Sequence, residues 1–230
     1  MSSKPQPIIA LDVPSATEAR ALVSTLGARA DFYKVGLQLF TAEGPSVVDW
    51  LHAEGKRVFL DLKLHDIPST VQKAAANAKR LSVALLTVHG QGGDAMVRAA
   101  VEGAGAHTGV LVVTVITSMD LASASAALGH PLNSLGDEVL RLAAVAAGAG
   151  AHGVVCAGGE CAAVRAKYAE KLQPLVPGIR TGSVGGDDQS RVVTPEDAAK
   201  AGAAYVVIGR AVTAAPDPAS ALEGVLSRLL

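Results

Sequence analysis

Two charged residues, Asp61 and Lys63, interrupt an otherwise apolar segment with the character of a β-strand. Because side chains alternate across a strand, both charges fall on one face, while Leu60, Leu62 and Leu64 fall on the other. A charge in an apolar interior costs several kcal/mol unless oppositely charged partners compensate it. An ammonium that neighbouring carboxylates keep charged is a suitable general acid. The spacing therefore indicates acid–base chemistry, with a purely structural ion pair as the alternative.

Three further charged residues stand where neighbouring strands are expected to end. Asp12 ends the first expected strand, Lys34 lies near the end of the second, and Asp66 follows the third. In a closed parallel barrel the carboxyl ends of all strands meet at one mouth, where active sites are built. We therefore expect these three residues to join the first two at that mouth, where opposite neighbours keep each ion charged.

The elements that must position these residues are short apolar, β-branched runs that alternate with helical patterns. Helix start signals such as Ser or Thr before the helical runs, and Gly after them, support this division. Eight such units in 230 residues predict the α/β class and a single (β/α)8 TIM barrel spanning residues 1–230. The expected strands are 8–13, 32–36, 58–64, 85–89, 110–116, 153–156, 175–177 and 205–208.

Composition narrows the class of protein. Half of the residues are hydrophobic but only 3% are aromatic, so we expect an aliphatic core. Lys and Arg (20) nearly balance Asp and Glu (21) without any basic run, which argues against nucleic-acid binding. Two cysteines, Cys156 and Cys161, favour buried thiols in a reducing compartment over a disulfide or a metal site. No apolar run reaches the roughly 18 residues of a membrane span, and no signal-peptide pattern begins the chain, so we expect a cytoplasmic protein.

Two connections differ from the others. Segment 117–136 is rich in Ala and Ser and follows the fifth expected strand, and segment 181–190 follows the seventh and is rich in Gly. Both leave the carboxyl end of a strand, so they could close over a ligand at the mouth. Composition alone leaves a surface loop without function as an equal alternative.

The charged segment belongs to a longer pattern, Asp61-x-Lys63-x-x-Asp66-Ile67-Pro68. This pattern resembles the signature of the orotidine 5′-phosphate decarboxylase family, and Thr70 fits its extension. Further segments resemble that family in the same order along the chain, and these are 10–12, 34–36, 114–118, 177–180, 186–191 and 207–210. The resemblance covers nearly the whole chain.

The resemblance implies decarboxylation of orotidine 5′-monophosphate (OMP) to uridine 5′-monophosphate (UMP), with no metal or organic cofactor. Loss of CO2 leaves negative charge at C6 of the pyrimidine, where no adjacent group provides an easy electron sink. The family pattern gives Lys63 the role of stabilising this carbanion and protonating C6. It places Asp61 beside the departing carboxylate, and Lys34 and Asp66 complete the expected catalytic set.

The same resemblance implies the residues that bind substrate. Asp12 and Lys34 are expected at the ribose hydroxyls. Asp66, Ile67 and Thr70 are expected to reach into the neighbouring subunit's site, which implies a homodimer. Thr117 and Ser118 are implied at the pyrimidine edge, and Arg180, Gln189, Gly209 and Arg210 at the phosphate.

Two alternatives remain at this point. Relatives such as 3-keto-L-gulonate 6-phosphate decarboxylase and hexulose 6-phosphate synthase share the Asp-x-Lys-x-x-Asp pattern but use magnesium, with an acidic ligand in place of Lys34. A cation at that position would repel the metal ion. A non-catalytic nucleotide-binding barrel is the second alternative, and the joint presence of Lys34, Asp61, Lys63 and Asp66 argues against it.

Overall fold

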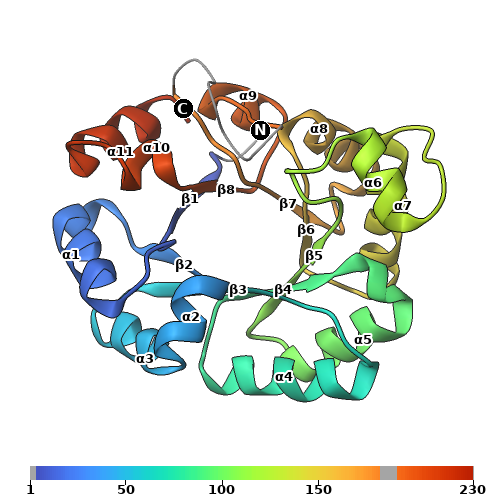
Figure 1. Ribbon diagram of the computed structural model, residues 1–230, viewed down its shortest axis with the longest axis horizontal. Coiled ribbons are helices and arrows are strands. Elements are labelled where there is room, and N and C mark those ends of the chain that lie inside the picture. Colours follow the sequence, from blue (N-terminus) through green and yellow to red (C-terminus); the bar gives the residue numbers. More distant parts are fainter. Residues whose placement is uncertain (1–3, 182–190, 230) are drawn as a thin grey trace.

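Eight parallel strands close into a barrel in the order of the chain, as the computed structural model shows for residues 4–181 and 191–229 (Figure 1). The predicted barrel is confirmed, because strand follows strand around the ring without a crossover. The strands are β1 (Gln6–Ala10), β2 (Phe32–Gly36), β3 (Arg57–Leu64), β4 (Leu85–His89), β5 (Gly109–Val113), β6 (Gly153–Val155), β7 (Gln173–Val176) and β8 (Tyr205–Ile208).

Helices form an outer ring around the barrel (Figure 1). They are α1 (Ala16–Leu26), α2 (Leu37–Glu43), α3 (Ser46–Ala53), α4 (Pro68–Arg80), α5 (Gly93–Ala104), α6 (Leu121–Leu128), α7 (Leu135–Gly148), α8 (Gly158–Tyr168), α9 (Pro195–Lys200), α10 (Arg210–Thr213) and α11 (Pro218–Ser227), with short 3-10 turns at Gly27–Arg29 and Gly90–Gly92. The expected caps are present, since Ser15 accepts from the Glu18 N–H and Thr194 accepts from the Asp197 N–H.

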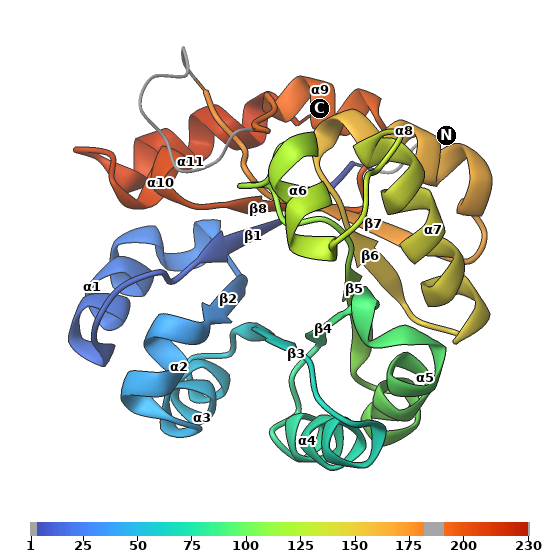
Figure 2. The same cartoon turned by 45° about the vertical axis from the view of Figure 1, so that its right-hand side comes forward.

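Three expected strands, β2, β4 and β8, have the predicted bounds, and the others differ at their ends. The largest differences are at the carboxyl ends of β1 and β5, since β1 ends at Ala10 instead of residue 13 and β5 ends at Val113 instead of residue 116. The expected loop 117–136 contains a helix, α6, which Figure 2 shows standing apart from α7. The segment 182–190 lies outside the described residues, so the expected movable loop there stays a prediction.

The core has two layers. The larger layer lies between the sheet and the helices and is almost entirely aliphatic, as the composition predicted. The smaller layer fills the inside of the barrel, and it includes Phe32 and Phe59, two of the chain's three phenylalanines. Leu85, Leu111 and Leu175 complete most of this plug. Because this plug fills the inside of the barrel, a site must lie at one of its ends, and barrels place their sites at the carboxyl end.

Strand β3 departs from regular pairing at its carboxyl end. Leu60 pairs with Leu86 of β4, but the next pairing joins Leu64 to Val88, so β3 places more residues in that interval than β4 does. Within the interval, Lys63 has a backbone φ of 50°, in the left-handed region that non-glycine residues rarely adopt. The irregularity lies where the two charges of the strand are found, and such bulges often redirect a side chain.

Two further findings concern the cysteines and the length of the helices. Cys156 and Cys161 are both free and buried, as expected from their number and spacing. Among residues 4–181 and 191–229, no helix is long and apolar enough to cross a membrane.

Candidate active site

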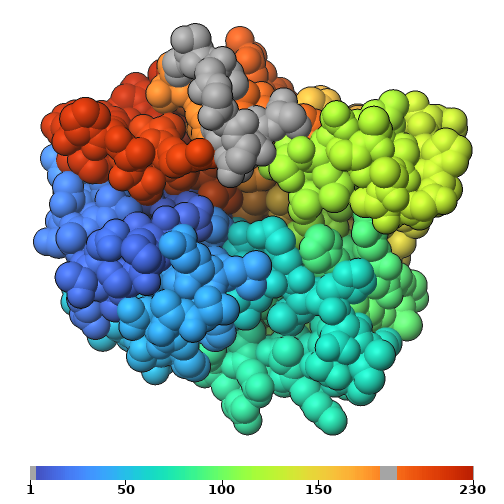
Figure 3. Space-filling view, in the orientation of Figure 1, coloured from blue at the N-terminus to red at the C-terminus, as the bar shows by residue number. Residues whose placement is uncertain are grey.

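A cavity of about 640 Å³ opens at the carboxyl end of the barrel. The space-filling view shows the surface hollowed there, between the blue, cyan and red segments of the chain (Figure 3). The apolar residues Phe59, Leu175 and Val207 form its floor, and they belong to the plug inside the barrel. The described charged residues of its lining are Asp12, Lys34, Asp61, Lys63, Arg180 and Arg210.

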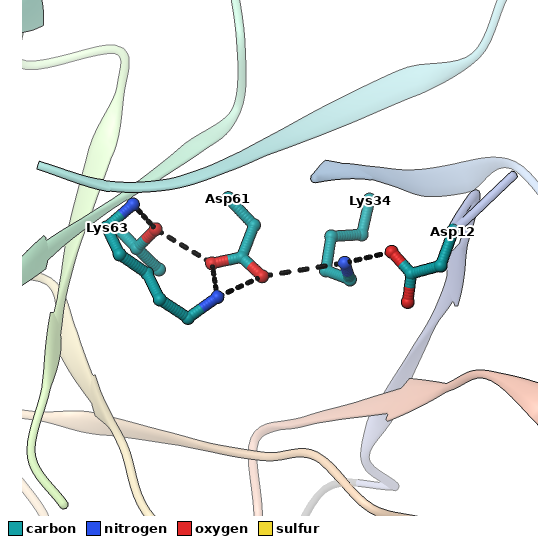
Figure 4. Close-up of polar contacts among 5 residues, drawn as sticks. Asp12, Lys34, Asp61 and Lys63 are labelled. Carbon is teal, nitrogen blue, oxygen red and sulfur yellow. Dashed lines mark hydrogen bonds and ion pairs between the residues drawn. The ribbon is translucent and has the colours of Figure 1, made fainter. Parts of the chain in front are cut away.

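Four of these charges form a continuous row that alternates in sign (Figure 4). Lys34 Nζ lies 2.7 Å from Asp12 Oδ1 and 3.5 Å from Asp61 Oδ2. Lys63 Nζ contacts both oxygens of Asp61, at 2.9 Å to Oδ1 and 2.8 Å to Oδ2. Lys34 lies on β2, Asp61 and Lys63 lie on β3, and Asp12 follows the end of β1, and the carboxyl ends of these three strands adjoin in the sheet. We refer to these four residues as the charged row.

The alternation that the sequence predicted for β3 is confirmed. Leu60 is buried in the core layer beneath the helices, and Leu62 and Leu64 pack against the same layer. Asp61 and Lys63 line the cavity on the opposite side. The chain thus separates an apolar face and a charged face within a single strand.

Asp61 is the most enclosed acid of the row, with 8% of its surface exposed. Burial by itself raises the pKa of its carboxyl, because it disfavours the charged form. The charges of Lys34 and Lys63, with hydrogen bonds from Lys63 and Thr87, outweigh burial and hold the pKa below its usual value. Asp61 is therefore an anion at neutral pH.

Thr87 was not among the residues expected from the sequence. Its side chain is fully buried, and its hydroxyl donates to Asp61 Oδ1 at 2.9 Å. The Thr87 hydroxyl oxygen in turn accepts a hydrogen bond from the backbone N–H of Lys63, also at 2.9 Å. The sequence held one signal for Thr87. Leu85 of β4 points into the barrel, and the residue two positions later on a strand lies on the same face.

Gly36 leaves the space in which Lys34 and Asp12 meet. A Cβ atom at this position would lie 2.9 Å from Lys34 Nζ and 3.1 Å from Asp12 Oδ1. Even an alanine would therefore press on the contact between these two charges. In the sequence, Gly36 stands out only as part of segment 34–36, which resembles the family.

The loop after β5 carries Thr117 and Ser118, and both line the cavity as expected. An arginine from elsewhere in the chain, Arg191, supports the start of this loop. Its guanidinium donates to the carbonyl oxygens of Val115 at 3.0 Å and Ile116 at 3.1 Å. The same group forms an ion pair with Glu160 of α8 at 2.7 Å, where both side chains are largely enclosed. Arg191 thus holds the loop to α8.

The side of the cavity formed by β7 and β8 carries the residues expected at a phosphate. Arg180 follows β7, and Gly209 and Arg210 follow β8 at the start of α10. All three line the cavity. Gln189, the fourth expected residue, lies outside the described residues.

Asp66, Ile67 and Thr70 do not join the cavity within one chain. All three are exposed on the segment that leads from β3 into α4, and Ile67 keeps 64% of its surface exposed. The Asp66 carboxylate accepts a hydrogen bond from the Ile67 N–H. The expected convergence therefore holds for Asp12, while Asp66 stands apart from the charged row in the single chain.

A histidine pair lies beyond the row. The rings of His65 and His89 stand 5.4 Å apart. Burial, followed by the electrostatic influence of the neighbouring His65 and Lys63, lowers the pKa of His89, and Asp61 opposes this only in part. His89 is therefore neutral at pH 7.

Comparisons with known proteins agree with this geometry. The family model described as orotidine 5′-phosphate decarboxylase / HUMPS matches residues 5–225, a range that contains every described residue of the cavity lining. A protein named orotidine 5′-phosphate decarboxylase from Anaeromyxobacter sp. (strain K) is 47% identical over 221 residues, covering 96% of this chain and 96% of that protein. A protein of the same name from Nitrosococcus oceani is 44% identical, covering 95% of this chain and 94% of its own length.

A solved structure shows the same similarity in three dimensions. The crystal structure of orotidine 5′-phosphate decarboxylase from Lactobacillus acidophilus superposes with a TM-score of 0.86 at 31% identity, and the match covers 99% of each chain. The structure of the protein of that name from Pyrococcus horikoshii OT3 superposes with a TM-score of 0.77 at 26% identity, over 97% of this chain and 99% of that one. The shared barrel therefore extends over nearly the whole chain.

Proposed function

Because the chain belongs to the orotidine 5′-phosphate decarboxylase / HUMPS family, we propose that it decarboxylates OMP to UMP in pyrimidine biosynthesis. The reaction makes it a carboxy-lyase. The whole chain serves as one catalytic barrel domain. The observation that carries the proposal is the charged row, which places an ammonium against an enclosed carboxylate at the mouth of the cavity.

Lys63 is the group that meets the reacting carbon. When the bond between C6 and the carboxylate breaks, its electron pair stays at C6, and the ammonium of Lys63 stabilises that charge and then donates a proton to C6. CO2 leaves with no electrons beyond its own, so the step needs no oxidant or reductant. Because the ammonium stands in place before the charge develops, it need not reorganise during the reaction.

Asp61 has two functions in this scheme. It holds Lys63 through both carboxylate oxygens, at 2.9 and 2.8 Å, and so fixes the direction of the proton that will be transferred. It also lies on the side of the cavity to which the substrate carboxylate must come. Repulsion between the two carboxylates raises the energy of the bound substrate relative to the transition state, in which the substrate charge has moved away.

Lys34 distinguishes this activity from that of the magnesium-dependent relatives. Its ammonium occupies the space between Asp12 and Asp61, at 2.7 and 3.5 Å. A divalent cation bound by these two carboxylates would have to displace that ammonium or stand beside it. The row therefore supports a reaction in which a lysine, without a metal ion, stabilises the developing charge.

For the rest of the cavity we propose the substrate contacts that the resemblance to the family implies. Asp12 and Lys34 bind the ribose hydroxyls, and Thr117 and Ser118 bind the edge of the pyrimidine. The phosphate lies at the β7–β8 side, bound by Arg180, Gly209 and Arg210, with Gln189 as a further ligand. Barrels commonly bind phosphate after their last two strands, which agrees with this direction of the substrate.

One assay tests the activity. Purified protein is mixed with OMP in EDTA, and the ultraviolet absorbance of the pyrimidine is followed. We expect conversion to UMP at an unchanged rate when the chelator concentration is raised. Turnover that appears only after magnesium is added would indicate the metal-dependent relatives, and the absence of turnover under both conditions would refute the proposal.

We also propose a homodimer in which Asp66, with Ile67 and Thr70, completes the neighbouring site. Their exposure in the single chain supports this, because an exposed isoleucine beside the signature is suited to an interface. Mixing a Lys63→Ala variant with an Asp66→Ala variant tests it, since each mixed dimer would contain one site with both residues intact. We expect the mixture to regain activity that neither variant has alone. If mixing restores nothing, Asp66 does not act across subunits.

We also propose a cellular compartment and a set of binding partners for the protein. The two buried free thiols are suited to the reducing cytoplasm, and OMP is the small-molecule partner. Neither nucleic acid nor a membrane is assigned as a partner, because the nearly balanced charge offers no general attraction to polyanions.

A further inference from the structure

We propose that Thr87 is a positioning residue for catalysis, and that its single hydroxyl fixes Asp61 and the backbone of Lys63 relative to each other. The inference deepens the proposed function, because it concerns the acid and the carboxylate of the same reaction. Thr87 does not line the cavity and is fully buried, so it acts through these two residues rather than on the substrate.

The hydroxyl uses both of its hydrogen-bonding capacities. A threonine hydroxyl has one hydrogen to donate and lone pairs with which to accept. Here the hydrogen points to Asp61 Oδ1 at 2.9 Å, and a lone pair accepts from the Lys63 N–H at 2.9 Å. Asp61 Oδ1 also accepts from Lys63 Nζ at 2.9 Å. The contacts form a closed ring that joins Thr87, Asp61 and both ends of Lys63.

The register shift in β3 explains why such a device is needed at this position. Between the pairings of Leu60 with Leu86 and of Leu64 with Val88, the two strands are out of step. Lys63 lies in this interval with a φ of 50°, a conformation that is unfavourable for a residue with a side chain. Such a conformation persists only where the surroundings hold it, and the bond from the Lys63 N–H to Thr87 is one such restraint.

The carboxylate is restrained by the same hydroxyl. Asp61 Oδ2 is directed to Lys34 and Lys63, while Oδ1 is directed to Lys63 and Thr87. Without the hydroxyl, both remaining partners of Asp61 are flexible lysine side chains. Rotation of the carboxylate would then carry the ammonium of Lys63 away from the position required for proton transfer to C6.

Three variants separate this role from ordinary packing. Thr87→Val keeps the shape of the side chain but removes the hydroxyl, and Thr87→Ser keeps the hydroxyl. The matched control is Thr108→Val, because Thr108 is also buried but its hydroxyl donates to the Val83 carbonyl oxygen at 2.9 Å, away from the charged row. Loss of either hydroxyl leaves a buried polar group unsatisfied, so both valine variants are expected to lose stability.

The kinetic measurement is the turnover of OMP by the three variants and the unmodified protein, with urea unfolding curves recorded in parallel. For Thr87→Val we expect kcat to fall by about 10²-fold, the scale of a displaced catalytic group, with a much smaller change in KM. Thr87→Ser should restore most of the loss, and Thr108→Val should keep its kcat. Equal kcat values for the two valine variants, or no recovery with serine, would overturn the proposal.

A second measurement does not depend on turnover. The pKa of the Asp61 carboxyl is followed by ¹³C NMR of protein labelled at aspartate carboxyl carbons, with an Asp61→Asn variant for assignment. We expect this pKa to rise in Thr87→Val and to stay unchanged in Thr108→Val, because only the first loses a hydrogen bond to the carboxylate. An unchanged pKa in Thr87→Val would refute the restraint. If the unmodified protein does not convert OMP, the proposed reaction fails, and this titration still decides the role of Thr87.

Discussion

The two sides of the cavity carry charge in different ways. On the side of β1 to β3, carboxylates and ammonium groups alternate at 2.7, 3.5 and 2.8 Å, so their charges balance within the chain. On the side of β7 and β8, the described charged residues of the lining are two arginines, Arg180 and Arg210. The first side is organised before any substrate arrives. The second side thus carries two guanidinium groups among its described residues, and guanidinium groups are suited to binding an anion such as a phosphate.

This contrast implies that the two sides have different functions in the reaction. Interactions that exist before binding can act on the transition state without reorganising, whereas interactions with a remote anion can hold the substrate and supply binding energy. Changes on the balanced side should therefore alter the chemical step, and changes on the arginine side should depend on the presence of the phosphate. The predictions below test this difference, beginning with the largest effect.

The largest effect is expected for Lys63→Ala. Removal of the acid leaves the C6 carbanion without a neighbouring ammonium, so kcat should fall by at least about 10⁴-fold, at the upper end of the range for one acid–base group. Binding of UMP, measured by calorimetry, should persist because the arginine side is intact. The control is Lys171→Ala, an exposed lysine before β7, which should leave kcat unchanged. If Lys63→Ala kept more than one hundredth of its activity, Lys63 could not be the acid.

An intermediate effect is expected for Arg210→Ala. Loss of one phosphate ligand should lower kcat/KM for OMP by about 10² to 10³-fold, although Arg210 touches no reacting atom. The same variant should have almost no effect on the slow turnover of orotidine, which lacks the phosphate. Equal losses with both substrates would show that Arg210 supports the structure of the site instead of binding phosphate.

The smallest effect concerns acid stability on the balanced side. The folded-state pKa of Asp61 is held below its usual value, so its ion pairs contribute stability that is complete above the unfolded-state pKa of about 3.9. That contribution is lost as the pH falls through the folded-state pKa, with a slope of at most about 1.4 kcal/mol per pH unit.

Urea unfolding between neutral pH and pH 3 measures this slope. Asp61→Asn should flatten the acid part of the curve relative to the unmodified protein. Asp94→Asn is the control, because Asp94 pairs with Arg98 at the surface, where both side chains are more than half exposed, and it should change little. Parallel curves for Asp61→Asn and the unmodified protein would contradict the assigned direction of the pKa.

The sequence predicted the barrel and the charged face because both depend on simple periodicity. Alternation in 58–64 separated the leucines from Asp61 and Lys63, and the structure has the same division. The end of β5 was placed too late, at residue 116, because Thr114, Val115 and Ile116 continue a β-branched run. Propensity does not show where a neighbouring strand stops pairing.

Thr87 and the register shift could not be predicted for a related reason. A period of two residues gives the face on which a side chain lies, but not its position relative to the next strand. The bond between Thr87 and the Lys63 N–H depends on the offset between β3 and β4, which is visible only once both strands are in place. The part played by Asp66 depends on a second chain and stays a prediction.

The irregular end of β3 also limits how the site can be transplanted by design. An engineer who copied Asp61 and Lys63 onto a regular strand of another barrel would copy their identities without the left-handed turn of backbone from which Lys63 extends. With regular strand dihedrals, the lysine side chain would leave the backbone in a different direction. A neighbouring strand in regular register would also place no hydroxyl beside the backbone N–H of the lysine. The smallest portable unit is therefore the pair β3 and β4 with its offset, and the charged motif alone is not enough.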